Sequence, residues 1–296
     1  MSTTDVRRDA DFDHGSARSG PDRGRWGRMA HSPLGWALAG LVGVGLVAGV
    51  TANGPGPVPV LGGGVAVGVY WVVMRRLARR ATPEIAGRGA GRQALLGTAL
   101  GLGFVAVSTL LIVAFGGYSF SWAHHAVVGT LASVLAVQAG ASLTEELMFR
   151  GVALQAIEQR WGSRVAVAAT ALFFGAVHMA NPGATLWSGL SIAVEAGAML
   201  GAAFLWQRSI WLVTAVHFAW NSAEQLLGVP VSGHTPDARL FSVRTSGSHL
   251  LTGGAFGLEA SVFPVVIGLL LAMLMFAAAR RSGNVVPARR ADRRNR

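Results

Sequence analysis

Long apolar runs separated by short polar connectors dominate the chain from about residue 34 to residue 279. Each run approaches the ~20 residues that an α-helix needs to cross a bilayer. The pattern therefore predicts an all-α, polytopic membrane protein with about eight transmembrane helices. The expected spans are 34–52, 58–74, 94–115, 126–149, 165–180, 186–206, 210–227 and 258–279.

The ends of the chain have a different composition. Residues 1–33 mix Arg with Asp and lack apolar periodicity, so we expect a disordered cytoplasmic tail. Residues 280–296 predict a second, Arg-rich cytoplasmic tail after the membrane domain 34–279. Because the run that begins at Leu34 follows a long polar lead and is longer than a signal-peptide core, we interpret it as a membrane anchor.

Arginine is concentrated in alternate connectors. The arginines in the second, fourth and last connectors are Arg75, Arg76, Arg79, Arg80, Arg88, Arg92, Arg160, Arg164 and those from Arg280 onward. Connectors 53–57, 116–125 and 181–185 contain no charged residue, whereas the long segment 228–257 carries two arginines. The positive-inside rule then predicts that both termini lie in the cytoplasm. We expect the protein to span the plasma membrane.

Composition limits the function. Charged residues make up only 13% of the 296 residues, where soluble proteins carry about 25%. The formal charge of +11 lies beside apolar runs, so we attribute it to membrane orientation and expect no nucleic-acid partner. The chain contains no cysteine. Chemistry must therefore come from histidine, carboxylate, hydroxyl or amide groups, without a thiol nucleophile or a Cys-ligated metal.

The run 126–149 ends in two adjacent carboxylates, Glu145 and Glu146, followed by Arg150. Glu146 and Arg150 share a helix face at i and i+4, whereas Glu145 points about 100° away and has no such partner. Ionisable groups inside a membrane normally face protein or water, so the two acids are expected to differ in role. The alternative is a solvated charge cluster where the helix meets the interface.

Two histidines follow in later runs. His178 ends the run 165–180, and His217 lies one turn before Asn221 in the run 210–227. Glu145 and His178 are each about 16 residues, ~24 Å, from the turn near residue 162, and His217 is ~13 Å from the next cytoplasmic turn. If the hairpin near residue 162 projects ~10 Å into the cytoplasm, as its polar segment 158–160 favours, the counts agree and predict one cavity about 13 Å from the cytoplasmic boundary. Taken singly, each histidine could equally be a hydrogen-bonding helix contact.

The ordered motifs Glu-Glu-x-x-x-Arg, Phe-x-x-x-His and His-x-x-x-Asn resemble those of the CPBP family of intramembrane proteases, which comprises CAAX prenyl proteases and bacteriocin-processing (Abi-type) proteins. The resemblance covers about 126–227, which we expect to be the catalytic core. The residues that carry it are Glu145, Glu146, Arg150, Phe174, His178, His217 and Asn221.

The resemblance implies an intramembrane endopeptidase that acts on a peptide or membrane-protein substrate. Glu145 would be the general base toward water with help from His178, while His217 and Asn221 would bind the oxyanion. Glu146, Arg150 and Phe174 would support the site. A metal-dependent mechanism is also implied for the family, in which Glu145, His178 and His217 would bind Zn²⁺, although no His-Glu-x-x-His motif is present.

Two other readings of the intramembrane polar residues stay open. One is a catalytically silent membrane scaffold or bacteriocin immunity protein, and the other is a proton-coupled transporter. Four polar residues in three successive runs favour the protease. Glu195, in the middle of the run 186–206, belongs to none of the motifs, and we expect it to have a structural role.

Overall fold

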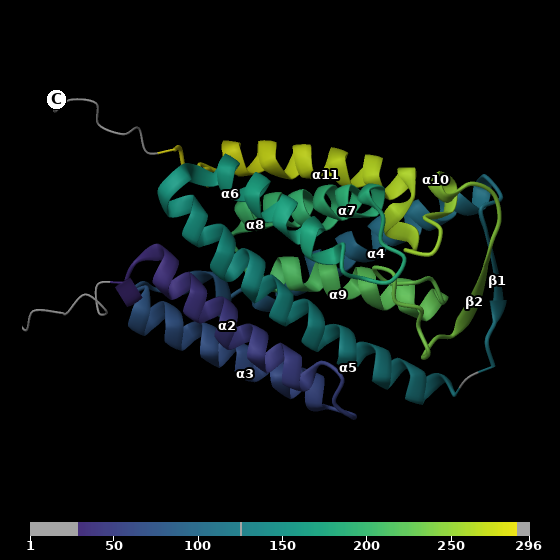
Figure 1. Ribbon diagram of the computed structural model, residues 1–296, viewed down its shortest axis with the longest axis horizontal. Coiled ribbons are helices and arrows are strands. Elements are labelled where there is room, and N and C mark those ends of the chain that lie inside the picture. The colour runs from purple at the N-terminus through teal and green to yellow at the C-terminus, as the bar shows by residue number, and fades with distance from the viewer. Residues whose placement is uncertain (1–28, 125, 289–296) are drawn as a thin grey trace, which may run out of the picture.

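The computed structural model describes residues 29–124 and 126–288 as a bundle of antiparallel helices (Figure 1). Most of the expected tail 1–33 and residues 289–296 lie outside the described residues. The elements are α2 (Pro33–Thr51), α3 (Val58–Val72), η1 (Val73–Leu77), η2 (Pro83–Ile85), α4 (Ala90–Ala114), β1 (Tyr118–Trp122), α5 (Val127–Glu146), η3 (Leu147–Leu154), α6 (Gln155–His178), α7 (Leu186–Ile192), η4 (Ala193–Met199), α8 (Leu200–Gln207), α9 (Ile210–Leu227), β2 (Phe241–Thr245), α10 (His249–Thr252), η5 (Leu258–Ala260) and α11 (Val262–Arg281).

The all-α membrane architecture is confirmed, but the number of spans is not. By length and hydropathy, 6 described helices can cross a membrane. The continuous helix Val127–His178 counts as one of them although it contains two expected spans, which meet at a bend where Gly162 has φ 80°. The helix Ile210–Leu227 is not among the 6. Its polar side chains, which include His217 and Glu224, lower its hydropathy.

The helix Leu186–Gln207, formed by α7, η4 and α8, is the centre of the bundle. In its most apolar window 83% of the residues are buried, whereas the corresponding fraction for α2 is 17%. The outer helices instead present large apolar side chains outward, for example Leu38 and Leu46 on α2 and Leu270 and Leu274 on α11. Such an apolar surface is expected to face lipid and not water. The central helix can therefore carry the polar groups that lipid-facing helices cannot.

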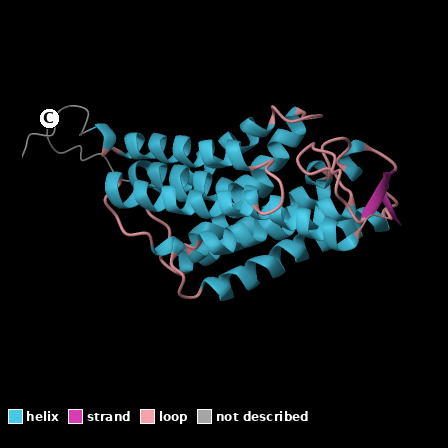
Figure 2. Ribbon diagram, turned by 90° about the horizontal axis from the view of Figure 1, so that it is seen from below, coloured by secondary structure: helices cyan, strands magenta, loops and turns pink. Residues whose placement is uncertain are grey.

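A small antiparallel sheet lies at one end of the helices, as Figure 2 shows. Strand β1 pairs with β2 from the segment that follows α9, with Tyr118 opposite Thr245. The Tyr118 hydroxyl donates to the Thr252 carbonyl at 2.5 Å, which fixes the sheet to α10. We call this end of the bundle the strand end. The hydrophobicity pattern did not predict the sheet, because the two strands are short and far apart in sequence.

Arginine and carboxylate side chains hold the opposite end, which we call the arginine-rich end. Arg208 donates to both carboxylate oxygens of Glu158 and to the Asn284 carbonyl. Val286 exchanges hydrogen bonds with Ser163, beside Gly162, where a Cβ would meet the backbone of 286–288. The described start of the expected C-terminal tail is therefore packed on the bend at Gly162 inside α6.

Helices α4 and α9 approach each other closely at glycines. A Cβ on Gly101 would lie 2.4 Å from the Val216 carbonyl oxygen, and one on Gly97 would lie 2.4 Å from that of Leu212. Phe104 packs on Trp220 just beyond, with ring centroids 4.8 Å apart. Because Val216 precedes His217, these contacts set the position of the histidine.

The close approach predicts that Gly101→Val displaces α9. Overpacking costs about 1–3 kcal/mol of unfolding free energy in a tight core. Because α9 packs tightly on α4 at this glycine, we expect a lower Tm in detergent. Gly103→Val in the same helix is the control, because a Cβ there meets no atom within 4 Å. Equal Tm values for the two variants would contradict this role of Gly101.

Candidate active site

The carboxylate of Glu146 is the hub of the polar residues inside the bundle. Its Oε1 atom accepts from Nη1 of Arg150 at 2.9 Å and lies 2.9 Å from Nδ1 of His217. All three residues are buried. Arg150 also donates to the backbone carbonyls of Ala196 and Gly197 in η4. One carboxylate thus connects η3, the central helix and α9.

The sequence brings these groups together through two π-helical turns. The turn η3 begins directly after Glu146, and η4 lies around Glu195 in the middle of the central helix. A π-helical turn widens the helix and is frequent at functional sites. In η4 it presents the carbonyls that Arg150 binds. The sequence predicted the Glu146–Arg150 pair, but not its contacts with His217 and η4.

Glu145 faces the other side of the His217 ring. Its Oε2 atom lies 4.0 Å from Nε2 of His217, and 32% of its side chain is exposed, whereas Glu146 is fully buried. The two neighbouring acids therefore differ as the sequence predicted, with one in a buried pair and the other accessible. With both carboxylates ionised and both Arg150 and His217 protonated, the four charges sum to zero, as burial requires.

Asn221 is buried one turn after His217 on α9. At this position it shares the helix face of the histidine, as the i, i+4 spacing predicted. On the same helix, the indole N–H of Trp220 donates to the carboxylate of Glu224, one turn later, at 2.8 Å. The α9 helix is also fixed to α5 by a hydrogen bond from Gln138 to Gln225 at 2.7 Å.

His178 joins the group through Phe174. The two rings stack with centroids 4.4 Å apart, and the Arg150 guanidinium lies 5.3 Å from the centroid of Phe174. Nδ1 of His178 lies 2.8 Å from the Phe174 carbonyl oxygen. Because a carbonyl only accepts, Nδ1 carries the proton and Nε2 of a neutral ring keeps its lone pair. His178 is partly exposed and is not seen in contact with Glu145 or His217 in the described part of the chain.

Comparison with known protein families finds one match. Residues 127–223 match the family described as type II CAAX prenyl endopeptidase Rce1-like. The match spans 97 of the 296 residues and supports the resemblance to CAAX-type intramembrane proteases. The matched segment contains Glu145, His178, His217 and Asn221. No curated protein matches the chain, and no solved structure does either.

The match supports an intramembrane endopeptidase, that is, a peptide hydrolase of a membrane. The matched residues coincide closely with the 126–227 core expected from the motifs. Within them the structure brings together Glu145, Glu146, Arg150 and His217, with Asn221 on the same face of α9 as His217.

The expected zinc ligands do not fit a shared metal ion. In the described chain, no three His, Asp or Glu side chains are grouped closely enough to hold one. Glu145 and His217 are neighbours, but His178 stacks on Phe174 and makes no polar contact with either of them among the described residues. We therefore derive no step through a metal.

Three further carboxylates lie near the site and were not recognised as a group from the sequence. Glu195, Glu224 and Glu259 are all buried. Neither carboxylate oxygen of Glu195 has a hydrogen-bond partner among the described residues, and the side chain packs on Gly268 of α11. Glu259 accepts from the backbone N–H of Ser232 at 2.6 Å and from its hydroxyl at 3.0 Å. Glu259 thereby fixes the segment after α9 to the start of α11.

The buried Glu146–Arg150 pair predicts a specific pattern of stability. Arg150→Met leaves an unpaired carboxylate inside the protein, so we expect a loss of about 3–5 kcal/mol in the unfolding free energy. The double variant Glu146→Gln/Arg150→Met leaves no unpaired charge there and should be more stable than Arg150→Met alone. Denaturant unfolding in detergent measures both. If the double variant lost as much unfolding free energy as Arg150→Met and Glu146→Gln lose together, the pairing would be contradicted.

Glu259 predicts a pH-dependent stability. Burial raises its pKa from 4.5 to about 7, against the hydrogen bonds from Ser232 and the charge of His217, which lower it. Between pH 4.5 and 7 the folded state therefore holds a proton that the unfolded state has lost, so this contribution to stability falls as pH rises.

Glu259→Gln should remove this dependence. The Tm of the wild type in detergent, relative to that of the variant, is expected to fall as pH rises through this window and to stay level above it. A constant difference in Tm from pH 4.5 to 7 would show that the pKa of Glu259 is not raised in the folded protein.

Proposed function

We propose that Glu145 is the general base of this endopeptidase and that His217 and Asn221 stabilise the oxyanion. The observation that carries the proposal is the arrangement around His217. Glu146 holds Nδ1 of the ring at 2.9 Å, and this turns Nε2 toward the accessible carboxylate of Glu145, 4.0 Å away. A water molecule and a peptide carbonyl bound beside Glu145 would meet both a base and a donor.

The chemistry balances with these groups alone. Glu145 takes a proton from water as the water oxygen attacks the carbonyl carbon of the peptide. The negative oxygen of the tetrahedral intermediate accepts hydrogen bonds from His217 and from the carboxamide N–H of Asn221. The C–N bond then breaks, and Glu145 returns its proton to the leaving nitrogen. The products are a carboxylic acid and an amine.

The donor role of His217 sets its protonation state. Because Nδ1 is engaged with the Glu146 carboxylate, it carries a proton, and a hydrogen bond donated by Nε2 then requires the doubly protonated ring. The two carboxylates and Arg150 balance that charge. Glu146 is thus a positioning residue for His217, in addition to its pair with Arg150.

His178 is proposed to orient the water. Its Nδ1 is bound to the Phe174 carbonyl, so the lone pair on Nε2 is available to accept a hydrogen bond. Phe174 keeps the ring in place by stacking, and Phe174 in turn packs on Phe149 with centroids 4.6 Å apart. A peptide substrate and the membrane are the partners implied by this site.

The test is cleavage of lipidated and unlipidated fluorogenic peptides by purified protein in lipid vesicles. Glu145→Gln keeps the size of the side chain but removes the base, so we expect a loss of about 10²–10⁴-fold in kcat. His217→Ala removes one oxyanion donor and should cost about 2.7–4 kcal/mol of transition-state stabilisation.

The matched control is Glu195→Gln, the same substitution at a buried carboxyl that takes no part in the proposed chemistry. Its kcat should stay close to that of the wild type. Equal cleavage by the wild type and by Glu145→Gln would reject Glu145 as the base.

A further inference from the structure

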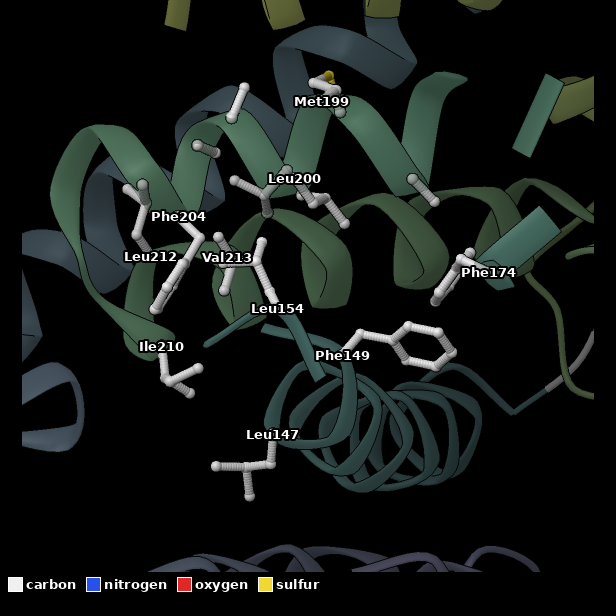
Figure 3. Close-up of a cluster of buried hydrophobic side chains, with 14 of the residues drawn as sticks. Leu147, Phe149, Leu154, Phe174, Met199, Leu200, Phe204, Ile210, Leu212 and Val213 are labelled. Atoms are coloured by element: carbon white, nitrogen blue, oxygen red, sulfur yellow. The ribbon is translucent and has the colours of Figure 1, made fainter. Parts of the chain in front are cut away.

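His178 lies at the very end of its helix. It is the last residue of α6, and Met179 and Ala180 continue the chain only as a turn. On one side the imidazole stacks on Phe174, which lies next to Phe149 in the buried cluster of Figure 3. The last turn of a helix frays unless other groups hold it. The position of the imidazole therefore depends on what binds the chain just after the helix.

The turn after α6 is bound to the segment that follows α9. The backbone N–H of Asn181 donates to the His178 carbonyl at 3.1 Å, so Asn181 is connected directly to the histidine. The Nδ2 atom of Asn181 donates to the carbonyl of Ser232 at 2.9 Å. Gly233 packs against the same turn, since a Cβ there would overlap the carbonyl oxygen of Pro182. The end of α6 is thus held from outside its own helix.

Ser232 is in turn held by a buried carboxyl. Its φ angle is 47°, in the left-handed region that residues other than glycine seldom adopt. Glu259, which is only 2% exposed, accepts from the Ser232 N–H at 2.6 Å and from its hydroxyl at 3.0 Å. A strained conformation persists only where its surroundings determine it. The two hydrogen bonds from one residue to one carboxyl do this for the Ser232 peptide.

The short helix η5, which carries Glu259, is anchored on two sides. The indole N–H of Trp187, at the start of α7, donates to the carbonyl of Ala260 at 2.8 Å. The backbone N–H of Gly233 donates to the carbonyl of Phe256 at 2.8 Å. Because η5 is fixed to α7 and to the segment after α9, Glu259 is a rigid support for Ser232.

Glu259 also borders the reacting groups. Besides its burial and the hydrogen bonds from Ser232, the pKa of Glu259 responds to the charges of His217 and Glu145, so these groups lie near it. Burying a carboxyl costs free energy, and an apolar side chain would join the same segments at lower cost. What the carboxyl adds is a directional contact beside the site.

We propose that Glu259, Ser232 and Asn181 form a positioning network for His178. Glu259 fixes the Ser232 peptide, the Ser232 carbonyl fixes the Asn181 side chain, and the Asn181 N–H holds the end of α6. Nε2 of His178 thereby stays directed at the attacking water. None of the three touches the substrate or the reacting atoms. The inference rests on the proposed role of His178 and extends it to Ser232 and Glu259, which lie outside the matched residues 127–223.

The test is a double-mutant cycle of Asn181→Ala and His178→Ala in the vesicle cleavage assay. Asn181→Ala should lower kcat about tenfold or more, because a misplacement of ~1 Å can cost 10²-fold. KM should stay at the wild-type value, since no contact with the substrate is lost. In the His178→Ala background the same substitution should leave kcat unchanged, because no imidazole remains to be positioned. A purely structural role of Asn181 would lower kcat in both backgrounds.

The matched control is Asn284→Ala. The Nδ2 atom of Asn284 also donates to a backbone carbonyl, that of Trp206, at 2.9 Å, but at the arginine-rich end. We expect the two alanine variants to have similar Tm values in detergent, and only Asn181→Ala to lose kcat.

Two substitutions of Glu259 test the other end of the network. Glu259→Gln can still accept from the Ser232 N–H and donate to its hydroxyl, so we expect a kcat close to that of the wild type. Glu259→Ala removes both contacts and should lower kcat as Asn181→Ala does.

The proposal would be overturned by an equal fall in kcat from Asn181→Ala with and without His178, or by an equal fall in Asn284→Ala. An unchanged kcat in Asn181→Ala or in folded Glu259→Ala would also overturn it. Failure of Glu145 as the general base is read from Glu145→Gln, a variant outside the cycle, so the two failures are distinguishable.

Discussion

The buried carboxylate of Glu146 is the contact on which the rest of the structure depends. It accepts from Arg150 and binds His217, and Arg150 binds the carbonyls of the central helix. A carboxylate or a guanidinium alone would be too costly to bury, so each group needs the others. This mutual requirement fixes the positions of η3, η4 and α9 relative to one another and turns the His217 ring toward Glu145.

Close packing of small residues makes that contact possible. Polar groups meet only where backbones approach, and Gly97 and Gly101 let α4 lie against the backbone of α9. Likewise Gly175 packs on the backbone at Gly189, which brings α6 to the central helix. In lipid, where no hydrophobic force drives helices together, such close contacts and interhelical hydrogen bonds supply the association.

The polar contacts at the arginine-rich end keep the α5–α6 hairpin in place. The Tyr70 hydroxyl donates to Glu84, which is bound to Arg80, and Gln155 contacts the same hydroxyl. Together with the Arg208–Glu158 pair, they hold both arms of the hairpin that carries Glu145 and His178. The two catalytic candidates are thus positioned by groups far from them, and the site itself remains free to be partly exposed.

The sequence by itself determined the helical membrane fold, the approximate helix boundaries and the Glu146–Arg150 pair, because these depend on local periodicity and on i, i+4 spacing. It also separated Glu145 from Glu146 by their helix faces. Only the tertiary structure decided the contact of Glu146 with His217, the β1–β2 sheet, and the buried group of Glu195, Glu224 and Glu259. These depend on how distant segments pack and bend, as at Gly162, and residue counts along single helices do not contain that information.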